Sequence, residues 1–160
     1  MHPAALAWVA RHAPPATSVV DVGGRDINGT VRACFPGVAY TSVDLIEGPG
    51  VDVVADFATW EPDHLVEVVV CCEVAEHAKA WPELLEHAAE ILTDDGVLIF
   101  TAAGPSRAPH SAFDGGELRD GEWYEAVDPV RLEEVLADHF CDVTVVEDQA
   151  LGDVYAVARR

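Results

Sequence analysis

Positive charge is scarce in this sequence of 160 residues. Lysine and arginine together number 9 against 29 aspartates and glutamates, which gives a formal net charge of −20. A surface this acidic repels nucleic-acid phosphates and anionic lipid headgroups. We therefore expect neither nucleic acid nor a membrane surface as a partner. The charge itself is typical of a protein that needs solubility or works in a cytoplasm of high salt.

Long apolar runs are also missing, and we expect no targeting segment. No run approaches the roughly 20 apolar residues of a membrane helix, and the chain does not open with the basic residues of a signal peptide. The cysteines show no CxxC spacing, which predicts reduced thiols and argues against a zinc site built from them. They are Cys34, Cys71, Cys72 and Cys141. These absences predict a cytoplasmic protein.

Half of the residues are hydrophobic, and the length fits one domain with a real core, so we expect residues 1–160 to form a single domain. Apolar runs bounded by turn residues predict strands at 18–22, 39–45, 51–55, 66–72, 97–101, 142–147 and 153–158. Helical spacing and end signals predict helices at 3–13, about 29–35, 81–92 and 128–140. The short turn before the last strand predicts an antiparallel pair.

Strands alternate with helices along most of the chain. This order predicts an α/β fold, with an open, mostly parallel sheet and helices on both faces. The run VEVVVCC at 66–72 is nearly all apolar, as is typical of a central strand covered on both faces. Ligands of such sheets bind beyond the carboxyl ends of the strands. We therefore expect the functional residues just after the strands.

Small and acidic residues follow the first predicted strand, in VVDVGGRDINGT. Gly23 and Gly24 let a ligand approach the backbone closely; the alternative is a tight turn without a ligand. Asp44 ends the second strand, 23 residues after Asp21, at a place where a carboxylate typically accepts hydrogen bonds from ribose hydroxyls. The two features together favour a ligand that contains adenosine.

Asp56 and Phe57 follow the third predicted strand. A carboxylate or amide there binds the amino group of adenine while the aromatic ring covers the base. The alternative for Asp44 and Asp56 is that each is a surface residue or a helix cap.

Five segments, in this order and spacing, resemble the Rossmann-like (class I) S-adenosylmethionine-dependent methyltransferases. They are VVDVGGRDINGT, YTSVDL, VVADF, VVVCCEVAEH and EILTDDGVLIFTAAGP, and they cover about residues 18–105. The resemblance implies a three-layer Rossmann-like sandwich with a seven-stranded sheet of order 3-2-1-4-5-7-6 and an antiparallel strand 7. It also implies S-adenosylmethionine as methyl donor and S-adenosylhomocysteine as product.

The resemblance implies a cofactor site built from the strand ends. Its members would be Asp21, Gly23, Gly24, Asp44, Leu45, Asp56, Phe57, Cys72 and Glu73. Asp21 and Gly23 would lie under the methionine portion, and Cys72 and Glu73 would line the floor below the sulfonium. Asp44 would hold the ribose, and the pair after the third strand would hold the adenine.

The first loop departs from the pattern of the family. Arg25 and Ile27 stand where the family carries a third glycine and a small residue, and the last glycine of the loop is moved to Gly29. This departure leaves the cofactor contacts of Gly24, Arg25 and Asn28 open.

The stretch 103–124 is too long and too rich in glycine, proline and polar residues to be a mere connection. In it, His110 is the candidate general base for an acceptor that must lose a proton. Asp114, Trp123 and Tyr124 are candidates to orient a substrate. The alternative is that His110 is an ordinary loop residue.

The pattern Glu73-x-x-Glu76-His77 also resembles a segment of methyltransferases that bind a divalent ion after their fourth strand. Carboxylates with an imidazole suit magnesium or manganese. The favoured interpretation is structural, with Glu76 and His77 capping the next helix, so we expect no metal here.

The sequence thus predicts a methyltransferase that acts on an O or N atom of a small molecule, or of a peptide or sugar, as a monomer or homodimer. One alternative is a non-catalytic cofactor-binding domain that serves a partner protein. Another is a nicotinamide-dependent oxidoreductase, against which the first loop and the Glu-His pair both count.

Overall fold

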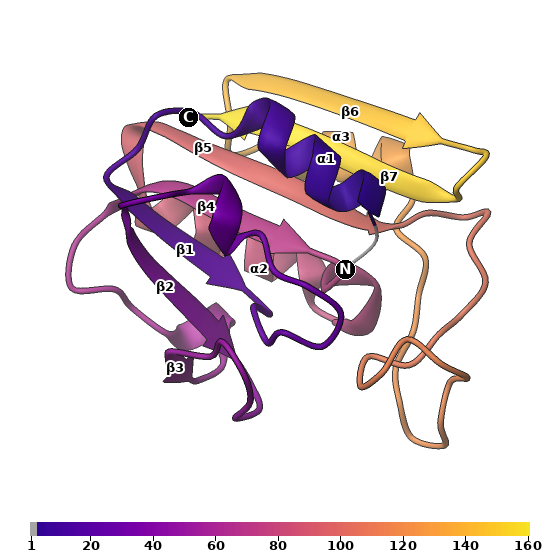
Figure 1. The fold of residues 1–160 in the computed structure, drawn as a ribbon. Coiled ribbons are helices and arrows are strands. Elements are labelled where there is room, and N and C mark those ends of the chain that lie inside the picture. Colours follow the sequence, from indigo (N-terminus) through magenta and orange to yellow (C-terminus); the bar gives the residue numbers. More distant parts are fainter. Residues whose placement is uncertain (1–2) are drawn as a thin grey trace.

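Seven strands form one sheet in the computed structural model, which describes residues 3–160. They are β1 (Ser18–Val22), β2 (Ala39–Asp44), β3 (Val53–Val54), β4 (Val66–Cys72), β5 (Leu92–Ala103), β6 (Asp142–Asp148) and β7 (Asp153–Arg159). Their order is β3-β2-β1-β4-β5-β7-β6, and β7 is antiparallel to both of its neighbours (Figure 1). The predicted fold and strand order are confirmed.

Helices cover both faces of the sheet. In Figure 1, α1 (Pro3–His12) crosses one face in front of β5 and β7, while α2 (Trp81–Ile91) and α3 (Pro129–Ala137) lie behind the sheet. The carboxylate of Asp128 accepts hydrogen bonds from the backbone N–H groups of Val130 and Arg131, which fixes the start of α3. None of the helices in residues 3–160 has the length and apolar character needed to cross a lipid bilayer.

Side chains of the central strands alternate between two hydrophobic cores, as the period of a strand requires. On β4, Val69 and Cys71 pack into the core under α2 and α3, whereas Val68 and Val70 pack into the core on the α1 face. All of these side chains are buried. The nearly uniform apolar sequence of β4 is thus explained by its place between two helical layers.

Four elements differ from their predictions by more than one residue at an end, and one of them is α3, which ends at Ala137 rather than at residue 140. The helix expected at 29–35 is a single 3₁₀ turn, η1 (Arg32–Cys34), because Pro36-Gly37 leaves too little chain for an α-helix. The strand expected at 51–55 shrinks to β3, because the Asp52 carboxylate accepts the Ser42 N–H at 2.9 Å where a strand would offer a carbonyl. Strand β5 begins at Leu92 rather than Val97, directly after α2.

We expect Leu85→Ala to lower the free energy of unfolding by about 2–5 kcal/mol, because Leu85 is 1 % exposed and its truncation leaves a cavity under α2. Leu65→Ala is the matched control: Leu65 is 55 % exposed, and its change should stay within about 0.5 kcal/mol. Urea unfolding of both variants measures the difference, and equal losses would contradict this assignment of the core.

Candidate active site

Two adjoining pockets open at the carboxyl edge of the sheet. The loop-side pocket, of about 390 Å³, lies between the first loop and residues 107–115. The β2-side pocket, of about 540 Å³, extends over the ends of β2 and β3. Gly23, Glu73 and His77 line both pockets, so the two pockets share part of their walls.

The ten side chains and glycines predicted as site residues all come to this edge. Those that line the loop-side pocket are Asp21, Gly23, Gly24, Cys72, Glu73 and His110. Those that line the β2-side pocket are Gly23, Asp44, Leu45, Asp56, Phe57 and Glu73.

The glycines after β1 are required by the packing of the protein itself. Gly23 has φ of +68°, and a Cβ atom on it would lie 2.3 Å from Val74 Cγ2. A Cβ on Gly24 would lie 2.3 Å from Ser42 Oγ and 2.5 Å from an Asp21 carboxylate oxygen. The tight turn and the packing around it therefore depend on these two glycines.

Asp21 is a buried carboxyl, 4 % exposed, at the wall of the loop-side pocket. The Tyr40 hydroxyl donates a hydrogen bond to its Oδ2 at 2.6 Å. Burial raises the pKa of Asp21 to about 7, and the hydrogen bond from Tyr40 opposes part of that rise. A positively charged ligand beside Asp21 would stabilise its ionised form.

Asp44 is held at the end of β2 by backbone donors. Its Oδ1 accepts the Ile46 N–H at 2.9 Å, and its Oδ2 accepts the Arg25 N–H at 3.3 Å. These bonds tie the first loop to β2 and fix the orientation of the carboxylate. Beside it, Leu45 is 70 % exposed at the mouth of the β2-side pocket.

Asp56 and Phe57 lie at the start of a 3₁₀ turn, η2 (Phe57–Thr59). The Asp56 carboxylate caps this turn by accepting the Ala58 N–H at 3.1 Å, so the predicted alternative of a cap is present at this position. Phe57 is 5 % exposed and meets His87 edge-on. Both residues also line the β2-side pocket.

Glu73 occupies the tip of β4 in a left-handed conformation, with φ of 59°, which is uncommon for a residue other than glycine. Its carboxylate accepts hydrogen bonds from Thr101 Oγ1 and from Arg107 Nη1, both at 3.0 Å. Arg107 also pairs with the buried Asp153. Next to Glu73, burial raises the pKa of the Cys72 thiol well above its usual value, so this thiol stays protonated.

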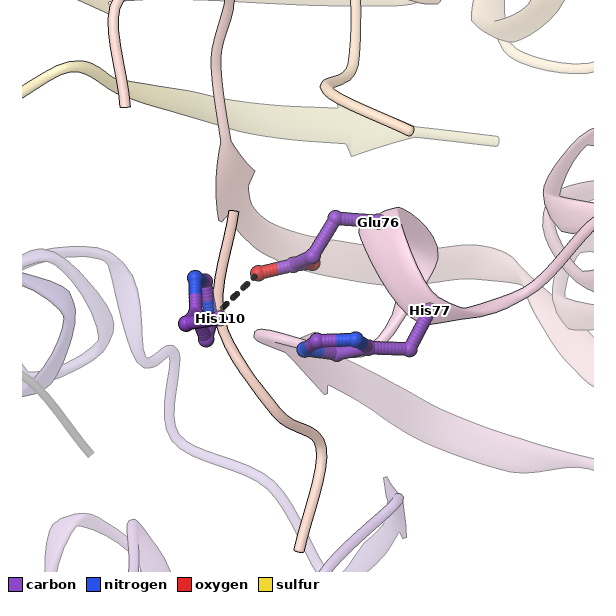
Figure 2. A group of neighbouring side chains, drawn as sticks. All are labelled: Glu76, His77 and His110. Atoms are coloured by element: carbon purple, nitrogen blue, oxygen red, sulfur yellow. Dashed lines mark ion pairs between the residues drawn. The ribbon is translucent and has the colours of Figure 1, made fainter. Parts of the chain in front are cut away.

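His110 meets Glu76 and His77, which belong to the 3₁₀ turn η3 (Ala75–His77) after β4 (Figure 2). His110 Nε2 lies 3.8 Å from Glu76 Oε1, and the two imidazole rings are 5.0 Å apart. Burial raises the pKa of Glu76 to about 8, and the charge of Glu73 adds to that rise. Burial, with a smaller effect of His110, lowers the pKa of His77 to about 4.

The expectation that Glu76 and His77 cap the next helix is wrong, because the N-cap of α2 is Ala80 and no side chain in residues 3–160 hydrogen-bonds there. In the alternative metal set, Glu73 is paired with Arg107 instead. His110, rather than Glu73, lies beside Glu76 and His77. Its position 33 residues after His77 carried no signal of this contact.

The long loop after β5 is held by its own polar contacts. Ser111 is 1 % exposed, its hydroxyl donates to Glu122 Oε1 at 2.7 Å, and its N–H donates to the Gly116 carbonyl. The guanidinium groups of Arg25 and Arg119 lie 5.9 and 5.3 Å from the centre of the Phe113 ring, so the long loop contacts the first loop through Arg25.

The three predicted substrate-orienting residues have different surroundings. Asp114 lines the loop-side pocket and pairs with Arg119. Tyr124 packs against the rings of His77 and His110. Trp123 is 39 % exposed beneath the ammonium of Lys79. Arg107, which neutralises Glu73, was not predicted, because nothing in its local sequence marks a partner so distant along the chain.

Comparisons with known proteins agree on one type of domain. A family model described as a methyltransferase domain matches residues 3–145. No curated protein sequence matches the chain significantly.

Several solved structures are similar in fold. The 1,6-didemethyltoxoflavin N1-methyltransferase of Burkholderia thailandensis superimposes with a TM-score of 0.67 at 21 % identity, over 99 % of this chain and 77 % of that one. An amino pentose methyltransferase from Micromonospora echinaspora gives 0.69 at 17 % identity, over 97 % and 89 %. The N-methyltransferase NodS from Bradyrhizobium japonicum gives 0.66 at 14 % identity, over 97 % and 83 %.

We expect Asp21→Asn to become more stabilising, relative to the parent, as pH rises. The pKa of Asp21 is raised to about 7 in the folded chain from 3.8, so its contribution to stability is present below the lower value and is lost as pH rises through the higher one. Between pH 5 and pH 8 the variant should gain about 2–3 kcal/mol on the parent, at 1.36 kcal/mol per pKa unit.

Urea unfolding at the two pH values measures this gain. Asp63→Asn, at an exposed position, is the control that should show no such change. A difference between Asp21→Asn and parent that is the same at both pH values would contradict the buried, raised carboxyl.

Proposed function

The chain belongs to the methyltransferase-domain family, and from that premise we propose that it transfers a methyl group from S-adenosylmethionine to an O or N atom of a small molecule, or of a peptide or sugar. The observation that carries the proposal is the pair of adjoining pockets at the carboxyl edge of the sheet, one suited to a nucleoside and the other to a reacting group. Among proteins of similar fold, two of those named above were crystallised with S-adenosylhomocysteine and one with S-adenosylmethionine.

The nucleoside end of the donor occupies the β2-side pocket. The Asp44 carboxylate is already oriented by two backbone N–H groups, and it accepts hydrogen bonds from the ribose hydroxyls. Adenine lies against Leu45 and Phe57, and Asp56 stands at its amino edge. Apolar side chains dominate this pocket, as expected for a site that binds a flat base.

The methionine end crosses into the loop-side pocket over Gly23 and Gly24. Its ammonium group and the sulfonium are positive, and both lie near carboxylates: Asp21 on one side and Glu73 on the other. Cys72 forms part of the floor and, as a protonated thiol, does not compete with the acceptor for the methyl group.

The acceptor enters from the side of the long loop and faces the methyl group. Methyl transfer is an in-line displacement, in which the protein must chiefly place the acceptor atom and exclude water. An acceptor hydroxyl or ammonium must also lose a proton, and we assign assistance in that step to His110, whose side chain lines this pocket. Because one sheet edge carries both pockets, the chain acts as one domain in this proposal.

Calorimetry with S-adenosylmethionine, S-adenosylhomocysteine and NAD tests the proposal. The first two should bind with one site per chain, and NAD should give no heat of binding. Binding of NAD alone would contradict the proposal in favour of an oxidoreductase. Binding of the methyl donor without turnover on any acceptor would favour a cofactor-binding domain that serves a partner.

We expect Asp44→Ala to weaken S-adenosylmethionine binding by about 1.5–3 kcal/mol, the usual effect of lost hydrogen bonds to a charged group. Asp63→Ala, at an exposed position outside both pockets, is the matched control and should bind like the parent. Calorimetry on variants with parental circular-dichroism spectra measures the change. An unaltered affinity in folded Asp44→Ala would remove Asp44 from the site.

His110→Ala should leave donor affinity nearly intact, because the strand ends hold the donor. Turnover with an identified acceptor should fall by about 10²-fold or more when the assistance to proton loss is removed. Binding and rate measured on the same preparation separate the two effects. Equal turnover in variant and parent would return His110 to an ordinary loop position.

A further inference from the structure

Three neighbouring side chains carry buried polar atoms that lack partners, and one of them, His77, lines the loop-side pocket. Glu76 Oε2, His77 Nδ1 and the Tyr124 hydroxyl make no hydrogen bond within residues 3–160. Buried polar atoms in native proteins nearly always have a partner. Three such atoms in side chains that pack together are therefore an observation that calls for a ligand.

The geometry of the cluster fits a metal ion. Glu76, His77 and His110 each offer one ligand atom, and these atoms all lie within 4.8 Å of one another. Ligand atoms about 2.1 Å from a common ion are roughly 3–4 Å apart. Small side-chain rotations would therefore bring these three atoms within binding distance of one ion. In Figure 2, the Glu76 carboxylate points toward His110, and the His77 ring lies beside both.

Burial and a backbone hydrogen bond fix the position of the Glu76 carboxylate. Glu76 is fully buried, and its Oε1 accepts the Ala103 N–H at 3.1 Å. This bond orients the carboxylate, and Oε2 has no hydrogen-bond partner among the described residues. Hydrogen bonds from outside a metal site orient its ligands in the same way. Glu73 is excluded from the set, because it is paired with Arg107 at 3.0 Å.

We propose that Glu76, His77 and His110 bind a divalent first-row transition-metal ion, with the Tyr124 hydroxyl beside it. Two imidazoles and one carboxylate suit ions such as Zn²⁺ or Mn²⁺. They suit Mg²⁺ and Ca²⁺ poorly, because those ions prefer sites made of oxygen atoms.

As a ligand of this ion, His110 would assist proton loss from the acceptor through the metal. His77 and His110 both line the loop-side pocket, so an ion between them faces the acceptor. A hydroxyl bound to such an ion is more acidic than a free one, which favours an acceptor with an oxygen ligand for the metal. This consequence rests on the proposed function, whereas metal binding itself is measured without donor or acceptor.

Titration of chelator-treated protein with Zn²⁺ and, separately, with Mg²⁺ tests the site by calorimetry. Zn²⁺ should bind at one site per chain and raise the melting temperature, and Mg²⁺ should give no comparable heat. His77→Ala and His110→Ala should each weaken Zn²⁺ binding by about 100-fold or more and abolish the rise in melting temperature. His64→Ala, an exposed histidine outside the cluster, should bind like the parent.

Parental Zn²⁺ affinity in His77→Ala and His110→Ala would overturn the proposal, as would the absence of Zn²⁺ binding to the parent. His110 lies on a loop, and its variant should melt at the parental temperature without metal, so the test does not depend on the folding of a buried variant. Failure here with intact binding of S-adenosylmethionine would leave the proposed methyl transfer in place.

Discussion

The parallel pairing of β1 with β2 and β4 is the constraint on which the site depends. Val22 lies opposite Val43 on one side and Cys71 on the other, so the three strands end together at one edge. Asp44, the residue after Val43, and Glu73, two residues after Cys71, are thereby brought to the same edge as Gly23. A shift of either pairing by one residue would turn their side chains to the opposite face.

Electrostatics at this edge suit a cationic ligand. Several carboxyl groups lie there, among them those of Asp21, Asp44, Glu73 and Glu76. Arg107 offsets the charge of Glu73, while burial keeps the pKa of Asp21 and Glu76 high in the free protein. The carboxylates would attract the sulfonium and ammonium groups of S-adenosylmethionine. They would repel the phosphates of a dinucleotide.

Much of the fold, and the gathering of the predicted residues at the carboxyl edge of the sheet, could be predicted from the sequence. Apolar runs marked the strands, and a glycine or carboxylate directly after a strand marked the residues at the edge. The strand order came from the resemblance to the class I methyltransferases. The contacts of the loop after β5 could not be predicted, because no periodicity governs a loop and its partners lie far along the chain. Thus Glu73 pairs with Arg107, and His110 rather than Glu73 meets His77.

A crystal structure of the chain with S-adenosylhomocysteine tests the central claim most directly. The account predicts the ribose hydroxyls within hydrogen-bond distance of the Asp44 carboxylate, the adenine beside Phe57, and the homocysteine chain over Gly23 and Gly24. Density for the ligand at any other place on the sheet, or none at saturating concentration in a pocket open to solvent, would contradict it.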